Sequence, residues 1–378
     1  MGAYGYDGLA FTGSDWFEWL SGYALKDQSF ERPYVLIITA DGRSFAVVSD
    51  LARYGIAMQA RCGEFWLDSV IHYSESSDSS RHKYLATQWQ DMLLQTLRTA
   101  GLTQGRIGVE GSGELLARAT AEFPGLRIER ASTDLRNVRR MKHPEEIATM
   151  RRCAALADWA IGAYREELRP GRLLAEIDSV VCTRLTVEAA KRHSSDRFAI
   201  VALRTMAGPA SICTDGFRAH DQVLQAGDGI VNTNIAVRLN GLAMELARPW
   251  LVGTVDRQIV SLLDCVHEAQ QQSMAAAVAG RPISGIHSAA QEVFERAGHA
   301  AQFFLRAGHG IGVVQHDFPV DVPFDDRALL ERETYAIEPA LNIENLGDFR
   351  FADTVAVTAS GGDPLTRAPR NRKDLTLS

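Results

Sequence analysis

Hydrophobic and polar positions alternate differently in the two parts of the chain. Up to about residue 135, short strand-like runs alternate with amphipathic helical runs, a pattern that is typical of an α/β domain. The strand-like runs are 7–13, 34–49, 106–111 and 126–130, and the helical runs are 85–101 and 114–123. A Ser-rich segment, 74–82, interrupts them and predicts a loop.

From residue 136 on, long helical patterns come first and strand-like hairpins follow. His143-Pro144-Glu145-Glu146 places a proline and two acids in the first turn of a helix that we expect to run to about Leu168. Further helices are predicted at 173–192, 254–279 and 284–298. Because there is no regular strand–helix–strand alternation, the pattern favours an α+β domain with an antiparallel sheet. We therefore predict two domains, 1–135 and 136–378.

Two apolar runs in the second part, 230–237 and 242–252, predict a β-hairpin. The pair Asn240-Gly241 between them accepts the positive φ angles that a two-residue type I′ turn requires. If the turn is centred on this pair, Asn234 and Glu245 lie on one face of the ribbon as diagonal neighbours. Polar groups on an otherwise apolar face are either exposed on a half-buried ribbon or gathered in a site.

The composition restricts the class of protein. With 378 residues and 46% hydrophobic content, the chain can bury a large core. A net charge of -7 without a basic stripe gives no footprint for nucleic acid. Charges interrupt every long apolar segment and the first residues have no basic region, so we expect a cytoplasmic protein without membrane span or secretory signal. The five cysteines show no CxxC spacing, which favours reduced thiols over a zinc cluster.

Three later segments also place polar residues in apolar surroundings: RAGHGIGVVQHDFP, YAIEPALNIE and DFRFADTVAVT. His309 lies between two glycines, which let backbone or ligand approach closely. A single histidine in such a loop fits a structural role as well as a catalytic one. Glu338 is the more specific signal, because a carboxylate in a strand-like run cannot be buried unpaired without a cost of several kcal/mol.

In this order, these segments resemble the pita-bread family that includes methionine aminopeptidase, prolidase, aminopeptidase P and creatinase. The similarity begins at KHPEEIATMRR and continues through the hairpin, GHGIGVVQH, IEPAL and FADTVAVT to DPLT and APR. DGLAFTGSDWFEWLSGY resembles the smaller domain of the two-domain members. The resemblance implies an α+β pita-bread domain at 136–378 and a creatinase-type α/β domain at 1–135. It also implies a homodimer in which the smaller domain reaches the partner's site.

Metallopeptidases of this family bind two divalent ions through Asp, Asp, His, Glu and Glu. At the corresponding positions this chain has Asn234, Glu245, His309, Glu338 and Ala352. Asparagine is a weak, neutral oxygen donor and alanine donates nothing, so a dinuclear centre is not expected. Glu245, His309 and Glu338 remain as a set that would hold one divalent ion with open positions.

The resemblance to creatinase, the member that works without metal, leads to a different reading. Creatinase also has Asn at the first aspartate position, which implies no cofactor and catalysis by acids and bases. SFERPY resembles the creatinase stretch whose Phe and Arg hold the substrate carboxylate in the neighbouring subunit's site. Phe30 and Arg32 are therefore predicted to bind substrate, since an arginine pairs well with a carboxylate.

The general acid or base is predicted from the family's histidine shortly before the Gly227-Asp228 turn. His220 is the first candidate, because the unperturbed pKa of a histidine suits proton transfer near neutral pH. Asp215 takes this position if the loop is aligned without a gap, and is otherwise grouped with Asn234 as substrate-binding. His316, at the family's second-histidine position, would orient the leaving group or donate to an oxyanion.

Together these features predict a cytoplasmic, homodimeric, metal-independent hydrolase of the creatinase type. It would cleave a non-peptide C–N bond, amidine or amide, in a small carboxylate-bearing substrate. The predicted catalytic residues are His220, Glu245, His309, His316 and Glu338. The alternatives are a mononuclear metal-dependent hydrolase or Xaa-Pro-type aminopeptidase, a lyase or decarboxylase on the same scaffold, and a catalytically inactive binding homologue.

Overall fold

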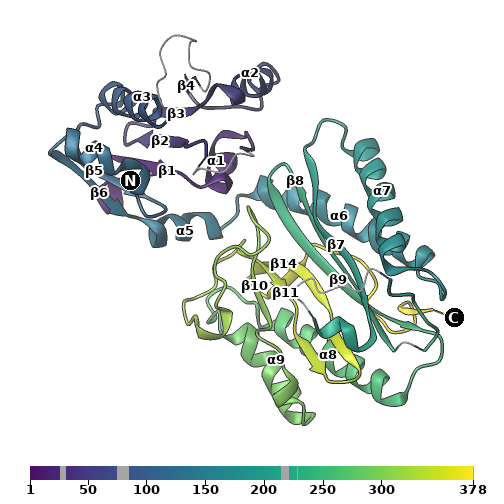
Figure 1. The fold of residues 1–378 in the computed structure, drawn as a ribbon. Coiled ribbons are helices and arrows are strands. Elements are labelled where there is room, and N and C mark those ends of the chain that lie inside the picture. Colours follow the sequence, from purple (N-terminus) through teal and green to yellow (C-terminus); the bar gives the residue numbers. More distant parts are fainter. Residues whose placement is uncertain (26–30, 75–84, 214–220, 228, 378) are drawn as a thin grey trace. The chain divides into compact units, whose positions relative to one another are not determined.

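The computed structural model describes residues 1–378 except 26–30, 75–84, 214–220, 228 and 378. The chain separates into two compact units, Met1–Val138 and Arg139–Ser378 (Figure 1). Each unit has its own sheet. Among the described residues, no helix has both the length and the apolar character needed to cross a bilayer.

The first unit is built on a six-stranded mixed sheet with the order β4-β3-β2-β1-β5-β6. Its strands are β1 (Gly8–Phe11), β2 (Val35–Thr39), β3 (Ser44–Ser49), β4 (Ser69–Tyr73), β5 (Gln104–Val109) and β6 (Gly125–Arg130). Its helices are α1 (Ser14–Ser21), α2 (Arg53–Arg61), α3 (Leu85–Ala100), α4 (Ala117–Glu122) and α5 (Ser132–Arg140), the last of which crosses into the second unit. Strands β1, β2 and β3 pair antiparallel, whereas β3–β4, β1–β5 and β5–β6 are parallel.

Alternating residues of the central strands enter two different cores. Val35 and Ile37 lie in a cluster with the α3 residue Leu93, whereas Leu36 lies in a second cluster with Phe17 of α1. Because helices cover both faces of the sheet, β2 has no polar face and appears in the sequence as a continuous apolar run.

The second unit carries four long helices and a larger, mostly antiparallel sheet. The helices are α6 (Pro144–Glu167), α7 (Leu174–Arg192), α8 (Arg257–Ala276) and α9 (Gly285–Arg296). The strands are β7 (Phe198–Ala207), β8 (Ile230–Leu239), β9 (Leu242–Val252), β10 (Gly308–Gly310), β11 (Thr334–Ile337), β12 (Ala340–Ile343), β13 (Gly347–Arg350), β14 (Ala352–Thr358), β15 (Gly361–Pro364) and β16 (Thr376–Leu377). Short 3₁₀ turns occur at Gly2–Tyr4, Asp50–Ala52, Glu114–Leu116, Gly208–Ile212, Ala300–Gln302 and Val322–Phe324.

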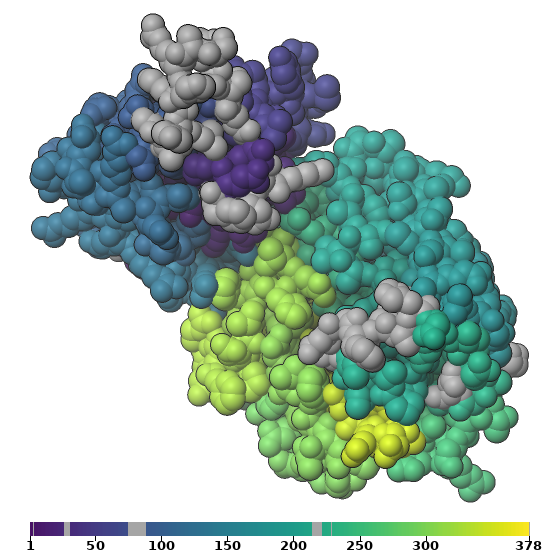
Figure 2. Space-filling view, in the orientation of Figure 1, coloured from purple at the N-terminus to yellow at the C-terminus, as the bar shows by residue number. Residues whose placement is uncertain are grey.

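The sheet of the second unit has the order β10-β11-β14-β9-β8-β7, with β15 beside β14 and β16 beside β9. Strands β12 and β13 form a separate ribbon. Helix α6 packs on β8 and β9, and α8 packs beside α9, β13 and β15. Strand pairing joins segments far apart in the chain, so teal and yellow-green segments lie side by side at the surface of this unit (Figure 2).

The predicted hairpin is confirmed. Asn240 and Gly241 have φ angles of 50° and 83°, as a type I′ turn requires. In the β8–β9 ladder Asn234 lies opposite Ala247 and Ala236 lies opposite Glu245, so the expected register is present. The predicted helices of the second unit are also found, with ends shifted by up to three residues.

A buried ionic cluster, which we call the Asp353 cluster, connects β9 and β14 to the chain that follows β15. Arg248 and Asp353 are both fully buried, and Nη2 of the arginine lies 2.7 Å from the carboxylate. Three further side chains donate hydrogen bonds to this carboxylate, from Gln270 at 2.8 Å, Thr366 at 2.5 Å and Arg370 at 2.8 and 2.9 Å. Arg248 also donates to main-chain carbonyls, including that of Ala352. The cluster therefore fixes β14 against β9, next to the candidate site.

Candidate metal and catalytic site

The candidate site lies where β9, β10 and the end of β11 come together. Glu245 projects from β9, His309 from β10 and Glu338 from the residue after β11. The backbone at β10 is close to its neighbours on both sides. A Cβ atom at Gly308 would lie 2.3 Å from the carbonyl oxygen of Ala336, and one at Gly310 would lie 2.3 Å from that of Phe318. Glycine is therefore required on each side of His309.

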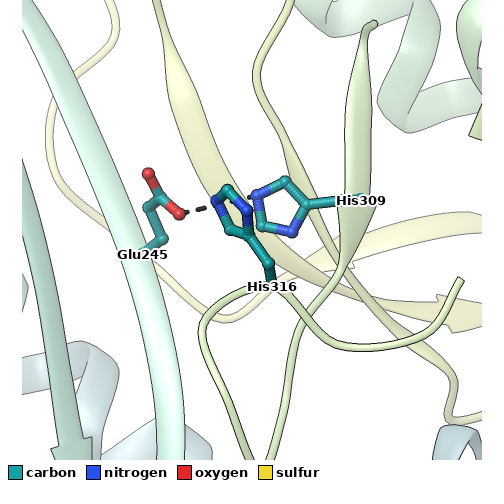
Figure 3. Close-up of side chains that lie close together, drawn as sticks. All are labelled: Glu245, His309 and His316. Atoms are coloured by element: carbon teal, nitrogen blue, oxygen red, sulfur yellow. Dashed lines mark ion pairs between the residues drawn. The ribbon is translucent and has the colours of Figure 1, made fainter. Parts of the chain in front are cut away.

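The side chains of Glu245, His309 and His316 converge in the structure (Figure 3). Nε2 of His309 lies 3.7 Å from Glu245 Oε2 and 3.3 Å from Glu338 Oε1. The rings of His309 and His316 have centroids 4.1 Å apart. On the other side of the His309 ring, Nδ1 donates a 2.8 Å hydrogen bond to the carbonyl oxygen of Gly310, which fixes the ring. Nε2 is thus directed at the two carboxylates.

Neighbouring charges raise the pKa of the histidine in this site and lower the pKa of a carboxylate beside it. Burial by itself would lower the pKa of His309, but the interactions with Glu245 and Glu338 outweigh burial and raise that pKa to about 10. For Glu338, burial opposes ionisation, but Arg350 at 2.9 Å and His309 together lower the pKa to about 2. In the absence of other cations, the two carboxylates therefore share one protonated histidine and an arginine.

Glu245 is held by amide side chains. Nδ2 of Asn234 donates to its Oε1 at 3.2 Å, and Nε2 of Gln315 donates to its Oε2 at 3.0 Å. Oδ1 of Asn234 is buried and makes no hydrogen bond. The carboxylate is therefore oriented toward His309 by neutral donors that add no charge to the site.

The structure places these predicted residues around a cavity of about 220 Å³. Its lining residues are Arg204, Asn234, Glu245, Phe304, Leu305, Arg306, Gln315, His316, Glu338 and Arg350. The three arginines and Gln315 were not predicted from the sequence. Arg204 lies opposite Asn234 in the β7–β8 ladder, so its place in strand β7 is the signal that could have identified it.

The remaining predicted site residues are not brought to this cavity by any described contact. Phe30, Asp215 and His220 lie outside the described residues. Arg32 belongs to the first unit, where its Nη1 lies 2.8 Å from Oε1 of Glu31. Their predicted roles in catalysis and substrate binding therefore stay predictions.

The donor set fits one divalent ion. Glu245, His309 and His316 each offer a ligand atom, and these atoms lie within 4.8 Å of one another. His309 Nε2 is buried without a hydrogen bond of normal geometry, which leaves its lone pair available once the nitrogen is deprotonated. A second ion does not fit, because Asn234 is neutral and Ala352 has no donor atom, so two negative charges that would hold it are missing.

The comparison with known families identifies the chain as a member of metallopeptidase family M24, whose model matches residues 148–359. Residues 1–141 match the Creatinase/Prolidase N-terminal domain. The predicted family and the predicted α+β pita-bread fold with a smaller N-terminal domain are therefore confirmed.

Named relatives are dipeptidases. The Xaa-Pro dipeptidase of Pyrococcus furiosus is 28% identical over 236 residues, which cover 62% of this chain and 66% of that protein. The putative dipeptidase YkvY of Bacillus subtilis is 24% identical over 311 residues, which cover 81% of this chain and 80% of that protein. The match thus spans slightly less than two thirds of the archaeal relative.

Solved structures share the fold over nearly the whole chain. A dipeptidase from Pyrococcus horikoshii OT3 superposes with a TM-score of 0.80 at 21% identity, covering 100% of this chain and 97% of that one. The N-terminal domain of the FACT complex subunit SPT16 from Cicer arietinum reaches 0.75 at 15% identity, covering 99% and 93%. Because such different proteins share the architecture, the fold by itself does not determine the activity.

The predictions of a metal-independent, creatinase-like hydrolase and of no cofactor are wrong. The family is one of metallopeptidases, and the relatives are named Xaa-Pro dipeptidases, which act on peptide bonds. The error lay in treating the loss of two carboxylates as the loss of all metal binding, although three protein ligands suffice for a catalytic ion. The broader expectation of a hydrolase acting on C–N bonds agrees with the family, since a peptide bond is a C–N bond.

Proposed function

We propose that the chain is a metal-dependent peptidase that hydrolyses short peptides of the Xaa-Pro type with a single divalent ion. Glu245, His309 and His316 would hold the ion, with Glu338 as a further oxygen donor. The observation that carries the proposal is the buried Nε2 of His309, which faces two carboxylates while Nδ1 is committed to Gly310. This arrangement is typical of a metal-binding histidine whose tautomer is fixed by the hydrogen bond of its other ring nitrogen.

A bound divalent cation would supply Lewis acidity, which polarises the scissile carbonyl and makes water more acidic. The protein groups around it have separate tasks. Gln315 and Asn234 orient Glu245, and Arg350 keeps Glu338 ionised. A fixed, charged donor set costs no reorganisation when substrate binds.

His316 is suited to proton transfer to the leaving amine. Burial and then the neighbouring His309 lower the pKa of His316, so its ring is neutral near pH 7. Its side chain is exposed to the cavity, within reach of a bound substrate. A neutral imidazole beside the reacting groups is able to accept a proton and return it. In this role His316 would leave the ion to Glu245, His309 and Glu338, which supply three protein ligands without it.

The proposal also keeps the predicted roles outside the described site. His220, or Asp215 in its place, would be a second acid–base group. In a homodimer, Phe30 and Arg32 would reach the partner's cavity and contact substrate. These roles rest on the resemblance of SFERPY and of the segment before Gly227 to the family.

The test combines metal content with turnover. Purified protein dialysed against Mn²⁺, Co²⁺ or Zn²⁺ is expected to retain one equivalent per chain by elemental analysis and to cleave Xaa-Pro dipeptides. Chelation should abolish turnover, and re-addition of the ion should restore it. Glu245→Gln should lose the ion, whereas His143→Ala, at an exposed position before α6, should keep it. Two tightly bound ions per chain, or full turnover after chelation, would refute the proposal.

A further inference from the structure

The chain turns back on itself between Gly310 and Asp317, directly after β10. The main-chain nitrogen of Asp317 donates a 2.8 Å hydrogen bond to the carbonyl oxygen of Gly310, and an isolated β-bridge pairs the two residues. Gln315 and His316 lie in this turn and line the cavity of the candidate site. We call residues 310–317 the site turn, because it carries the amide that orients an ion ligand and the imidazole proposed for proton transfer.

The buried carboxylate of Asp317 holds the site turn from inside. Its Oδ2 accepts a 3.1 Å hydrogen bond from the main-chain nitrogen of Val313, and its Oδ1 accepts one of 2.9 Å from that of Phe318. These two nitrogens lie on either side of Gln315 and His316 in the chain. The carboxylate therefore fixes the backbone from which both side chains project.

Arg139, in the last turn of α5, neutralises this carboxylate. Its Nη2 lies 2.9 Å from Oδ1 of Asp317, and its Nε lies 3.1 and 3.2 Å from Oδ1 and Oδ2. Both side chains are buried, at 2% and 1% exposure. A buried carboxylate that lost its arginine would be left as an uncompensated charge, so the two groups act as a unit.

Lys142 packs the end of α5 against the site turn. Its buried Nζ donates hydrogen bonds of 2.9 and 3.1 Å to the carbonyl oxygens of Arg139 and Arg140. A Cβ atom at Gly312 would lie 2.7 Å from this nitrogen and 3.3 Å from Oδ2 of Asp317. The turn therefore fits closely against the helix end, with no space for a side chain between them.

The site turn is also connected to the histidine on β10. The carbonyl oxygen of Gly310 accepts 2.8 Å hydrogen bonds from two donors, the main-chain nitrogen of Asp317 and Nδ1 of His309. Because the second bond directs Nε2 of His309 at the carboxylates of the site, a shift of Gly310 would turn the ring. Asp317 thus acts on His309 through Gly310, and on His316 as its neighbour in the chain.

We propose that Asp317, held by Arg139, is a positioning residue that keeps His309, Gln315 and His316 in their places around the ion. The inference rests on the proposed single-ion peptidase and adds a residue that acts through other side chains. Partners behind the groups that contact a metal ion typically change metal affinity or activity ten- to a hundredfold when they are removed.

Asp317→Asn tests the proposal in the full chain loaded with Mn²⁺. The variant keeps the shape of the side chain, but its amide NH₂ group meets a main-chain N–H and cannot accept a hydrogen bond from it. We expect both kcat for the dipeptide Ala-Pro and the affinity for Mn²⁺ to fall about ten- to a hundredfold, with KM changed by less than about twofold. Competition with a chelating dye measures the affinity.

Glu333→Gln is the matched control. Glu333 pairs with Arg140, the residue after Arg139, at 3.0 Å, and both side chains are buried. Its carboxylate also accepts a hydrogen bond from Tyr335, which lies outside the site turn. Loss of this buried pair should lower the melting temperature as Asp317→Asn does, because both variants neutralise a buried partner of an arginine. Its kcat and Mn²⁺ affinity should stay within about twofold of the wild type.

Arg139→Lys keeps the test decisive if Asp317→Asn does not fold. Lysine keeps the positive charge but cannot reproduce the paired geometry of the guanidinium. The variant should therefore show the same two losses, in kcat and in Mn²⁺ affinity, at smaller size.

The outcomes separate this inference from the proposed function. Lower melting temperatures with unchanged kcat and Mn²⁺ affinity in Asp317→Asn and Arg139→Lys would overturn the positioning role, and so would equal losses in Glu333→Gln. If the wild type cleaves no Xaa-Pro dipeptide while Asp317→Asn still weakens Mn²⁺ binding, the proposed function fails and the positioning role stands.

Discussion

The second unit contains two buried ionic clusters that differ in how completely the ionisable group at the centre of each is satisfied; among the described side chains of the Asp353 cluster, only Oε1 of Gln270, a neutral neighbour, lacks a hydrogen bond. In the Asp353 cluster, the carboxylate receives hydrogen bonds from Arg248, Gln270, Thr366 and Arg370. In the cluster around His309, the ring Nε2 and the Asn234 Oδ1 are buried without a hydrogen bond. The two clusters share strand β9, which supplies Arg248 to one and Glu245 to the other.

This difference separates a structural role from a ligand-binding role. A buried charge whose partners are all supplied by the protein stabilises one arrangement of the chain and has no capacity for a ligand. Orphaned polar atoms are rare in folded proteins. Asn234 lines the cavity, and Nε2 of His309 faces Glu245 and Glu338, which also line it. We therefore assign the Asp353 cluster to stability and the His309 cluster to ion binding.

The largest effect is expected when the satisfied cluster is broken. Arg248→Met leaves Asp353 with a single arginine and should lower the free energy of unfolding by about 3–5 kcal/mol. Denaturant unfolding of the metal-free protein measures this change. Arg370→Met, at a side chain that is 23% exposed, should cost clearly less. Equal costs for the two variants would contradict the assignment.

Glu245→Gln is expected to have a smaller effect, on metal affinity and not on stability. The variant removes an ion ligand, so metal affinity should fall by at least about a hundredfold, which corresponds to about 2.7 kcal/mol. Stability of the metal-free protein should change little, because neutralising Glu245 also removes its repulsion of Glu338. Competition with a chelating dye measures the affinity. If the variant mainly lost stability and kept the ion, the cluster would be structural after all.

Gln315→Leu tests whether the hydrogen bond from Gln315 holds the ion ligand Glu245 in position. Loss of the 3.0 Å hydrogen bond to Glu245 should reduce metal affinity about tenfold, or about 1.4 kcal/mol, because outer partners orient ligands. The same titration measures it. Gln291→Leu, on the exposed side of α9, serves as the control and should bind metal as the wild type does. An unchanged affinity in Gln315→Leu would show that Asn234 orients Glu245 alone.

The most gradual effect is expected from pH, because it is spread over several pH units. The pKa of His309, raised to about 10 in the folded, metal-free protein, lies above its unfolded value of about 6.5. The folded state thus binds the proton more tightly, and the resulting stability is fully present below about pH 6.5 and is lost as pH rises through 10. The slope is at most about 1.4 kcal/mol per pH unit. Melting temperatures of metal-free protein between pH 7 and 10 should fall, and should fall less in Glu245→Gln.

Much of the fold was predictable because local patterns and packing agree. The Asn-Gly pair specified the turn of the hairpin, and alternation then specified which residues share a face. Helix α2 was not predicted, and its face that includes Tyr54 and Met58 is exposed, so no burial pattern marked it. The helix α1, of eight residues, is too short to give a clear period.

The site was predictable only where residue type and motif coincide. Glu245, His309, His316 and Glu338 lie in recognisable segments and meet in the structure. Arg204 and Arg306 lie in runs that contain no charge pattern, and a lone arginine on a strand gives no indication of the strand or loop that it will face. The number of ions a site holds depends on the distances between ligands, which spacing along the chain does not supply.

The tight backbone around β10 limits how this site can change over evolutionary time. Because neither neighbour of His309 has room for a side chain, that segment admits almost no substitution and keeps the imidazole in one place. Changes to the site are then more easily accommodated on the facing strands, where Asn234 and Ala352 stand at positions to which the family resemblance assigns acidic residues. A protein engineer who wishes to retune the ion or the reaction should vary those strands and leave the histidine segment alone.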